Sequence, residues 1–480
     1  MSYFARVGEI RPAHAPVDET PPEIERLIQL WRSSCPTNGG EIEINDADLV
    51  RIPKIGESGS IYKGKRCYTI YRVPPEIYVC DANAYQPKAV CIGPFFYDQR
   101  KDSRLKSMQD YKYVCVDKLI SGHDREVLVD KCLWKMKELE GRVRSRYSET
   151  FPSIKPDKFA QMLMLDGCFL LYLLLRRAPG EAAVSDDDDD DAWQLVGRLW
   201  IWNLVKYDLL LLQNQIPFFV IRHLYDLLRP GDNNINLVDC AINLFSTLDP
   251  CRKLEQTRFF IRVEEVHHLL HLIYLSILPC PQYCETYREQ QSPQWIPSAT
   301  ELQGAGIKFK KRKKTGGFLS FLDIRFYRRF YGGVIEIPQL KVHDYSVSLF
   351  RNLIAFEQCY PDTQQCIAAY AAFMNLLIST KRDMRLLHLN EILINDMTVD
   401  KDAANFFGRL CNEVHYAHDR NYLRGLFREV TTYYDSIWHK WRAQLHQNYF
   451  SNPWSIISVI AGALLLSLSL IQTIVTGLSR

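Results

Sequence analysis

The sequence predicts a mainly α-helical body with a small antiparallel β element, followed by one C-terminal transmembrane helix. Most of the chain carries apolar residues at helical spacing, and residues 157–177 are a very apolar example. Residues 305–342 instead contain short segments joined by glycines, which is typical of strands and turns. Residues 451–479 carry no charge, which is typical of a membrane span. A chain of 480 residues can bury a large core, so we expect a single large helical domain.

The overall composition excludes several classes of protein. Lys and Arg total 59 and Asp and Glu total 56, and this balance excludes a globally basic nucleic-acid binder. A mean hydropathy of −0.19 excludes a membrane protein with many spans. The 14 cysteines are scattered, and residues 1–30 contain no apolar run of a secretory signal. We therefore expect free thiols rather than a disulfide framework.

Residues 1–40 are predicted to form a loose arm that contains one short amphipathic helix. Residues 21–33 place apolar side chains on one face, with Thr20 as a cap and Pro21 in the first turn. The helical body is expected over residues 41–450.

The body is predicted to contain several helices separated by loops. The helical stretches are 102–149 with an interruption near Ser121 and Gly122, 157–177, 192–228 with an interruption at Pro217, 258–278, 346–380 and 383–439. Residues 185–191 read SDDDDDD, and the repulsion between like charges predicts a solvated loop. Asp166 lies within an apolar helix, so its carboxylate must be paired if it is buried.

The segment 454–478 is long enough to cross a bilayer. Its 25 residues would form a helix of about 37 Å, against a hydrocarbon core of about 30 Å. The alternative is a buried core helix. Lys440 and Arg442 precede the segment, and the positive-inside tendency then predicts a cytosolic body. The sequence thus predicts a single-pass, tail-anchored protein whose partner is the lipid bilayer, in either the plasma membrane or an endomembrane.

Small residues within this segment bear on self-association. Ser458 and Gly462 are four residues apart, as are Ala463 and Ser467. Such pairs let membrane helices approach closely, but they also occur by chance. A homo-oligomer is therefore left open.

One group of residues has ligand types that suit zinc. His267 and His271 are four residues apart on a predicted helix, and Cys280 and Cys284 follow. The sequence between the cysteines, CPQYC, is not the usual CxxC, and ordinary packing of these side chains is the alternative. We predict no metal and no cofactor, with these four residues as the candidates should a structural zinc be present.

No catalytic motif is present. A nucleophile and base could be drawn from Cys168 or Cys359 with His343 or His388, but no sequence pattern links them. The chain also lacks GxSxG, a phosphate-binding glycine loop and HExxH. We therefore predict that the protein is not an enzyme and has no catalytic residues.

Six cations occur within seven residues of the predicted β element. They are Lys308, Lys310, Lys311, Arg312, Lys313 and Lys314. Such a cluster can be a solvated hairpin, or it can contact anionic lipid, an acidic partner or nucleic acid. A membrane span in the same chain favours lipid or an acidic partner over nucleic acid, which we do not expect as a partner.

A series of short motifs resembles a known plant family. The motifs, in order, are IYRVP at 70–74, VCIGPF at 90–95, LDGCF at 165–169, DLLLLQNQIPFFV at 208–220, IPSATEL at 296–302, GIKFK at 306–310, FRNLIAFEQC at 350–359 and YFSNPWSIIS at 449–458. Their order and spacing resemble those of the family called domain of unknown function 247, over about residues 68–476.

The resemblance implies a plant-specific protein anchored in a membrane by its C-terminus, with no established catalytic residues. Some grass members of the family look like determinants of self-incompatibility. Two motifs depart from the family pattern. Gln213 stands where the family usually has an acid, and Phe96, Tyr97 and Asp98 replace its HHG. Any chemistry that depended on those acidic or histidine positions would be absent here.

These observations together predict a membrane-anchored, non-enzymatic recognition or signalling protein with an unknown protein partner. Anchoring raises the local concentration of the body near other membrane proteins. The loops 179–192 and 282–294 are the expected partner-facing surfaces. The alternatives are an enzyme with an unrecognised site and a zinc-stabilised scaffold.

Overall fold

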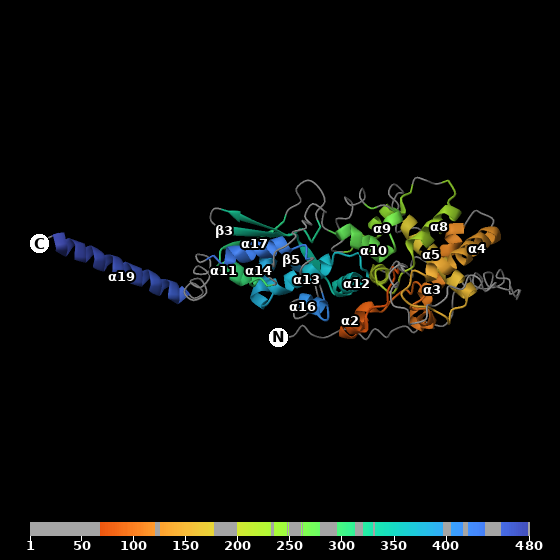
Figure 1. The fold of residues 1–480 in the computed structure, drawn as a ribbon, viewed down its shortest axis with the longest axis horizontal. Helices are drawn as coiled ribbons and strands as arrows, with labels where there is room; N and C mark the ends of the chain where they lie inside the picture. The colour runs from red at the N-terminus through yellow and green to blue at the C-terminus, as the bar shows by residue number, and fades with distance from the viewer. Residues whose placement is uncertain are drawn as a thin grey trace, which may run out of the picture.

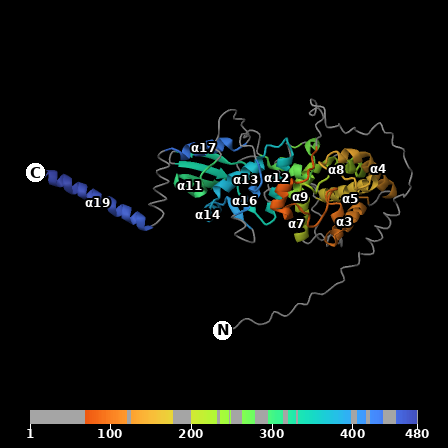
Figure 2. The same ribbon diagram turned by 60° about the horizontal axis from the view of Figure 1, so that its bottom comes forward.

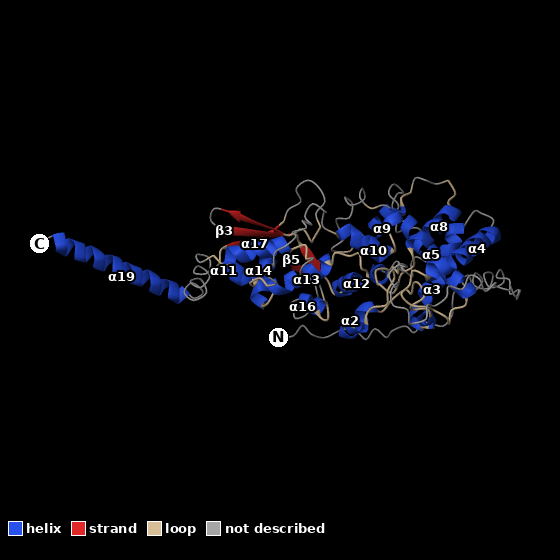
Figure 3. Cartoon of the chain, viewed as in Figure 1, coloured by secondary structure: helices blue, strands red, loops and turns tan. Residues whose placement is uncertain are grey.

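The computed structural model describes an elongated, mainly helical body and one helix that stands apart from it (Figures 1 and 3). The described residues are 68–120, 125–176, 199–231, 235–246, 248, 261, 263–278, 295–312, 320–329, 332–396, 405–415, 421–436 and 453–478. The predicted arm at 1–40, the aspartate run at 185–191 and the loops 179–192 and 282–294 lie outside them. One contiguous apolar core runs from Ile70 to Tyr433.

Helix α5 (Pro156–Leu175) is the centre of one end of the body (Figure 1). It is apolar on nearly all sides because α3 (Ser103–Ile120), α4 (Arg125–Arg144) and α8 (Phe218–Leu228) all pack around it. It is long and apolar enough to be tested as a membrane span, but 78% of its most apolar 18-residue window is buried, as in a core helix.

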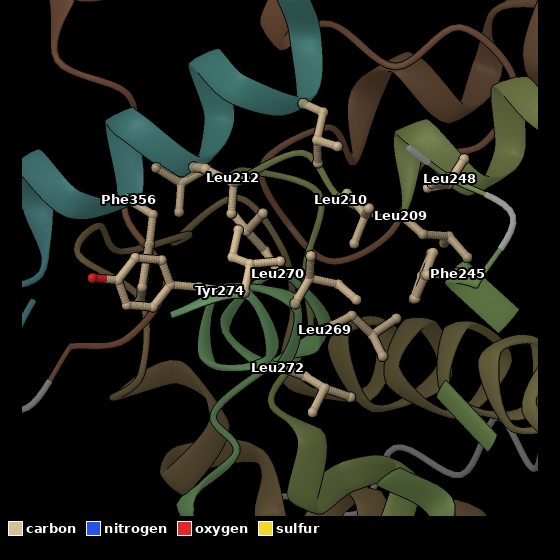
Figure 4. Close-up of a cluster of buried hydrophobic side chains, with 14 of the residues drawn as sticks. Leu209, Leu210, Leu212, Phe245, Leu248, Leu269, Leu270, Leu272, Tyr274 and Phe356 are labelled. Atoms are coloured by element: carbon tan, nitrogen blue, oxygen red, sulfur yellow. The ribbon is translucent and has the colours of Figure 1, made fainter. Parts of the chain in front are cut away.

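The middle of the body consists of short elements around an apolar cluster. They are α2 (Pro75–Cys80), η2 (Ala82–Tyr85), η3 (Asp98–Lys101), α7 (Leu199–Asp208), α9 (Leu237–Phe245), η5 (Val263–Glu265) and α10 (Leu269–Ile277). Figure 4 shows Leu209, which follows α7, beside Phe245 and Leu248, and Leu212 toward Leu270 and Phe356. These side chains are almost fully buried, so the segment after α7 is part of the core.

Two predicted helices are shorter than expected. The stretch 192–228 was expected to break only at Pro217, but α7 ends at Asp208 because residues 209–217 form a turn. The helix expected over 258–278 begins only at Leu269, since the ring of His268 accepts a hydrogen bond from the N–H of His271 and caps the helix.

The other end of the body contains a mixed three-stranded sheet. Its strands are β1 (Ile307–Lys311), β2 (Arg325–Arg329) and β3 (Gly332–Ile337), in the order β1-β3-β2, and α11 (Ala299–Gly304) precedes β1. β2 and β3 are antiparallel, but β1 pairs with β3 in parallel, so the prediction of a purely antiparallel element was wrong. Alternation of side chains does not distinguish the two pairings, because it has the same period in both.

Short helices complete this end of the body. They are α12 (Ser346–Cys359), α13 (Cys366–Leu377), α14 (Lys381–Leu389), α16 (Phe406–Cys411) and α17 (Arg424–Tyr434). The continuous helix expected over 383–439 is therefore wrong. β5 (Leu393–Asn395) interrupts it by pairing with β4 (Leu340–Val342), and α14 has already ended at Leu389.

Helix α19 (Pro453–Leu478) has 26 residues and lies away from the body in both views (Figures 1 and 2). Its large apolar side chains from Ile457 to Ile474 are 55–69% exposed. The predicted helix at 454–478 is confirmed as a helix. Its apolar part Ile460–Ile474 falls in the class of shorter apolar helices, so membrane crossing stays a prediction.

Candidate functional site

A buried group of charged residues lies where two of the sequence motifs, VCIGPF and LDGCF, meet. Asp166 of α5 accepts hydrogen bonds from both terminal nitrogens of Arg100 (2.9 and 2.6 Å) and from Nζ of Lys112 (2.6 Å). It also accepts one from the backbone N–H of Gly93 (2.8 Å). The Asp166 and Lys112 side chains have no exposed surface. The expected pairing of Asp166 is therefore present, and it fastens the VCIGPF loop to α5.

Nearby charges favour the ionised form of Asp166, whereas burial disfavours the ionised form of Lys112. Burial alone would raise the pKa of Asp166, but the charges of Arg100 and Lys112 outweigh it and hold the pKa below its ordinary value. Burial lowers the pKa of Lys112 to about 8, although Asp166 opposes that shift. The Lys112 ammonium also donates to the carbonyl of Cys91 at 2.5 Å. Except for Nε of Arg100, which is buried without a hydrogen-bond partner among the described residues, the named nitrogens and the carboxylate bind one another or backbone, which suits a structural role.

A second carboxylate holds the preceding part of the same loop. Asp208, at the end of α7, accepts hydrogen bonds from the backbone N–H groups of Lys88, Ala89 and Val90 at 2.6–3.0 Å. Burial raises the pKa of Asp208 to about 7, against the effect of these three donors. The first residue of the DLLLLQNQIPFFV motif therefore binds backbone from the VCIGPF region.

The amide side chains of the QNQ sequence continue this pattern. Asn214 accepts a hydrogen bond from the N–H of Ile92 (2.6 Å) and donates to the carbonyl of Val90 (3.0 Å). Gln215 donates to the carbonyls of Leu209 and Leu211, which closes the turn after α7. All of these contacts are to backbone, so the motif determines chain geometry.

The family departure at Gln213 has a structural explanation. Its side-chain oxygen accepts a hydrogen bond from the N–H of Val73 at 3.3 Å, and its surface is almost fully buried. An acid at this position could accept the same bond, and an amide does so without burying a charge. At the other departure, Phe96 is buried, and the centre of the Tyr97 ring lies 5.9 Å from Cζ of the Arg100 guanidinium.

The FRNLIAFEQC motif forms a third set of contacts between side chains and backbone. Asn352 accepts from the N–H of Leu212 and donates to the carbonyl of Ala84. Glu357 accepts from the N–H groups of Ile367 and Ala368, both at 2.8 Å, at the start of α13. Burial raises the pKa of Glu357 to about 8. A helix N-terminus is a favourable place for such an acceptor.

The histidines of the zinc candidate do come together. His267 and His271 have stacked rings with centroids 4.5 Å apart, although His267 precedes α10 and does not lie on its face. Nε2 of His267 contacts the Tyr360 hydroxyl at 2.8 Å, and Nδ1 of His271 accepts from the N–H of His267. Cys280 and Cys284 lie outside the described residues, within which no group of three metal-binding side chains occurs.

The candidate nucleophiles are in packing positions. Cys168 is buried in α5, where burial raises its pKa well above the ordinary value. The thiol of Cys359 lies 3.9 Å from the carbonyl of Arg72, and burial raises its pKa to about 12. His388 instead contacts the carbonyl of Leu393, and His343 lies 3.7 Å from the carboxylate of Asp396. The nine described cysteines are free thiols.

The structure separates the basic cluster into exposed and engaged residues. Lys308 and Lys310 on β1 are exposed. Lys311 forms an ion pair with Glu391 (3.1 Å), and Arg312 donates to the carbonyl of Asp323 (2.6 Å). Lys313 and Lys314 lie outside the described residues.

Sequence reasoning missed the partners of these side chains. Arg100 and Lys112 lie 66 and 54 residues before Asp166, and the sequence gives no signal that pairs them. Asp208 and Glu357 each lie within a motif that the sequence did reveal, but their roles as acceptors for distant backbone did not follow from it.

The fold and its buried polar groups define a mainly helical scaffold whose motifs hold one another in place. The family model described as "Plant protein of unknown function", DUF247, matches residues 70–468, so the chain belongs to this plant family, as the motifs indicated. The chain is 28% identical over 442 residues to UPF0481 protein At3g47200 of Arabidopsis thaliana, covering 87% of each. It is 24% identical over 177 residues to putative UPF0481 protein At3g02645 of the same plant, covering 37% of this chain and 32% of that protein. No solved structure matches the chain.

Proposed function

We propose that the protein is a membrane-anchored, non-catalytic recognition or signalling protein whose helical body is held at the cytosolic face by α19. The observation that carries this proposal is the exposure of α19. Its large apolar side chains from Ile457 to Ile474 are 55–69% exposed, and the helix lies away from the body. So large an apolar surface is stable in lipid and unfavourable in water. The charges of Lys440 and Arg442 support the cytosolic orientation.

A non-catalytic role is supported by the use of the buried polar residues. Asp208, Asn214 and Glu357 lie in family motifs, and each binds backbone from another segment. These groups fix the shape of the body, which leaves the surface and the membrane position to provide function. Because anchoring confines the body near other membrane proteins, weak contacts with a partner become sufficient.

Membrane extraction of substituted chains tests the anchor. We expect the full chain to remain in the membrane fraction after an alkaline wash. Replacing Leu464 and Leu468 together by Arg should release it, because each arginine at the centre of a span costs about 3 kcal/mol. The matched pair Leu464→Ile and Leu468→Ile should remain in the membrane. Retention of the arginine variant would overturn the proposed anchor.

Proximity labelling then tests the recognition role. A labelling enzyme fused to the N-terminus of the full chain should mark a reproducible set of membrane-associated proteins. The arginine variant of α19, which keeps the same body, should lose that set. An identical set from both chains would contradict a role that depends on anchoring.

A further inference from the structure

The sheet presents an outer face whose residues come from two separate segments of the sequence. The strand register places Lys308, Val334 and Tyr327 in one row and Lys310, Glu336 and Arg325 in the next. Paired residues share a face of a sheet. The outer face therefore consists of Lys308, Lys310, Arg325, Tyr327, Arg329, Val334 and Glu336, of which Val334 is itself buried. The opposite, inner face contains the buried side chains Ile307, Phe309, Phe326, Ile335 and Ile337.

The outer face is strongly basic. Its four cations are exposed, and it holds one carboxylate, so its formal charge is four minus one, or +3. That carboxylate, Glu336, accepts a hydrogen bond from the Tyr327 hydroxyl at 2.7 Å. The Arg329 guanidinium lies 5.3 Å from the centre of the Tyr327 ring. Neither Lys308 nor Lys310 forms an ion pair within the part of the chain that the structure describes.

The residues around the sheet account for the other cations of the sequence cluster. Side chains alternate along β1, so Lys311 lies on the same side of the strand as the inner-face residues, and it forms an ion pair with Glu391. Arg312 follows β1 and binds a backbone carbonyl. The basic surface is therefore not the contiguous run in the sequence. It is formed by two lysines of β1 together with Arg325 and Arg329 of β2.

The inner face of the sheet contacts α17, the last described element before α19 in the chain. Tyr433 of α17 packs edge-on against Phe326 with ring centroids 5.7 Å apart. Helix α17 is the last described element before α19, and 16 residues, 437–452, separate Ser436 from Pro453. A chain of that length spans at most about 60 Å in any conformation. Both views place the sheet and α17 at the end of the body nearest α19 (Figures 1 and 2).

We propose that the outer face binds the anionic lipid headgroups of the membrane in which α19 is anchored, and so orients the body on that membrane. This inference rests on the proposed function, because α19 must first place the sheet near the bilayer. The bilayer is favoured as the occupant because the tether keeps it permanently within reach, whereas a soluble acidic partner must be recruited. Each cation near an anionic surface strengthens membrane association about five-fold, and this attraction is screened by salt.

Lysine labelling on vesicles tests this contact. The full chain is reconstituted into vesicles of phosphatidylcholine alone or of equimolar phosphatidylcholine and phosphatidylserine, and an impermeant acylating reagent is added. We expect Lys308 and Lys310 to react at least about five-fold more slowly on the anionic vesicles, and molar salt to abolish the difference. Exposed Lys131 and Lys155, on α4 and before α5 at the other end of the body, should react equally on both. Equal labelling of Lys308 and Lys310 on the two vesicles would overturn the proposal.

A charge-reversal pair gives an independent measurement. Energy transfer from the body's tryptophans to a labelled lipid should rise on anionic vesicles for the wild type and for Lys131→Glu/Lys155→Glu. It should not rise for Lys308→Glu/Lys310→Glu, and a rise equal to that of the wild type would contradict the proposed face. All four substitutions are at exposed positions, so the thermal unfolding midpoint should be unchanged.

Vesicle flotation separates failure of the face from failure of the anchor. If both proposals hold, the full chain floats with either vesicle and shows the labelling difference. Flotation with both vesicles but equal labelling overturns only the proposed contact of the outer face with lipid. An acidic protein partner would then be the alternative occupant of that face. Flotation only with anionic vesicles overturns the proposed membrane insertion of α19, but it is compatible with binding of anionic lipid by the outer face.

Discussion

The carboxylate of Asp166 accepts a hydrogen bond from the backbone N–H of Gly93 at 2.8 Å, which joins the centre of α5 to a loop 73 residues earlier in the chain. Arg100 and Lys112 bind the same carboxylate, so two cations depend on one buried anion. Removing the anion leaves both without a counter-charge in a low-dielectric interior, which is far more costly than losing the hydrogen bonds alone.

Asp166→Asn should therefore reduce the free energy of unfolding by about 3–5 kcal/mol. Asp157→Asn on the same helix is the matched control, because its exposed pair with Lys137 should contribute no more than about 1 kcal/mol. Urea unfolding of the full chain in detergent measures both. A loss below about 1 kcal/mol for Asp166→Asn would mean that the cations find other partners.

Gly93 is predicted to tolerate no side chain. Its φ is +71°, and an added Cβ would lie 2.3 Å from the carbonyl oxygen of Gln215. Gly93→Ala should cost at least about 2 kcal/mol, through backbone strain and this clash. Gly231→Ala isolates the strain, since Gly231 has a φ of +84° and open space, and should cost about 1 kcal/mol. Gly141→Ala, in open space within α4, should stabilise the helix by about 0.5–1 kcal/mol. Thermal unfolding that did not give this order would refute the close approach at Gly93.

The histidines beside α10 should make stability depend on pH. Burial lowers the pKa of His271 to about 2, whereas an unfolded histidine has a pKa near 6.5. As the pH falls below 6.5 the unfolded chain therefore binds the proton first, and folding stability is lost. Asp208 and Glu357 act with the opposite sign, because burial raises their pKa values to about 7 and 8. The test is thus the difference between wild type and a His271 variant.

Between pH 7 and 4.5, His271→Gln should lose about 2–3 kcal/mol less stability than the wild type. Gln can still accept the hydrogen bond from the N–H of His267 that Nδ1 of His271 accepts. His388→Gln, at an exposed position, is the control and should follow the wild type. Parallel pH curves for the wild type and His271→Gln would show that His271 is not held neutral.

Removal of α19 should leave the body intact. The large apolar side chains of α19 from Ile457 to Ile474 are exposed and stabilise no part of the core. A chain that ends at residue 450 should therefore have the same free energy of unfolding as the full chain within about 0.5 kcal/mol. Circular dichroism during thermal unfolding measures this. A substantial loss of stability in the shorter chain would show that α19 packs against the body in solution.

The sequence was sufficient for the features that depend on local pattern. The apolar helix around Asp166, the β element near residue 320 and the helix at 454–478 each follow from composition and periodicity, and all are present. The need to pair Asp166 followed from burial alone. Its partners did not, since helix packing brings Arg100 and Lys112 to it across more than 50 residues.

Features that depend on which distant segments come into contact could not be predicted from the sequence. The parallel pairing of β1 with β3 and the strand β5 require contacts that no local pattern encodes. The early end of α7 depends on Gln215, whose side chain replaces helical hydrogen bonds with bonds to the carbonyls of Leu209 and Leu211. The outer face of the sheet could not be recognised from the run Lys308–Lys314, because strand pairing selects Lys308 and Lys310 and adds two arginines from β2.

The segment from Lys88 to Gly93 has no helix or strand, yet in the described part of the chain five of its six backbone N–H groups, all except that of Cys91, donate hydrogen bonds to buried side-chain oxygens. Those of Ala89 and Val90 bind Asp208, that of Ile92 binds Asn214 and that of Gly93 binds Asp166. Exchange of these amide hydrogens with solvent deuterium requires the motifs to separate. Deuterium uptake in this irregular stretch should therefore be as slow as in α5. The exchange rate of these loop amides would then measure how often the whole core opens.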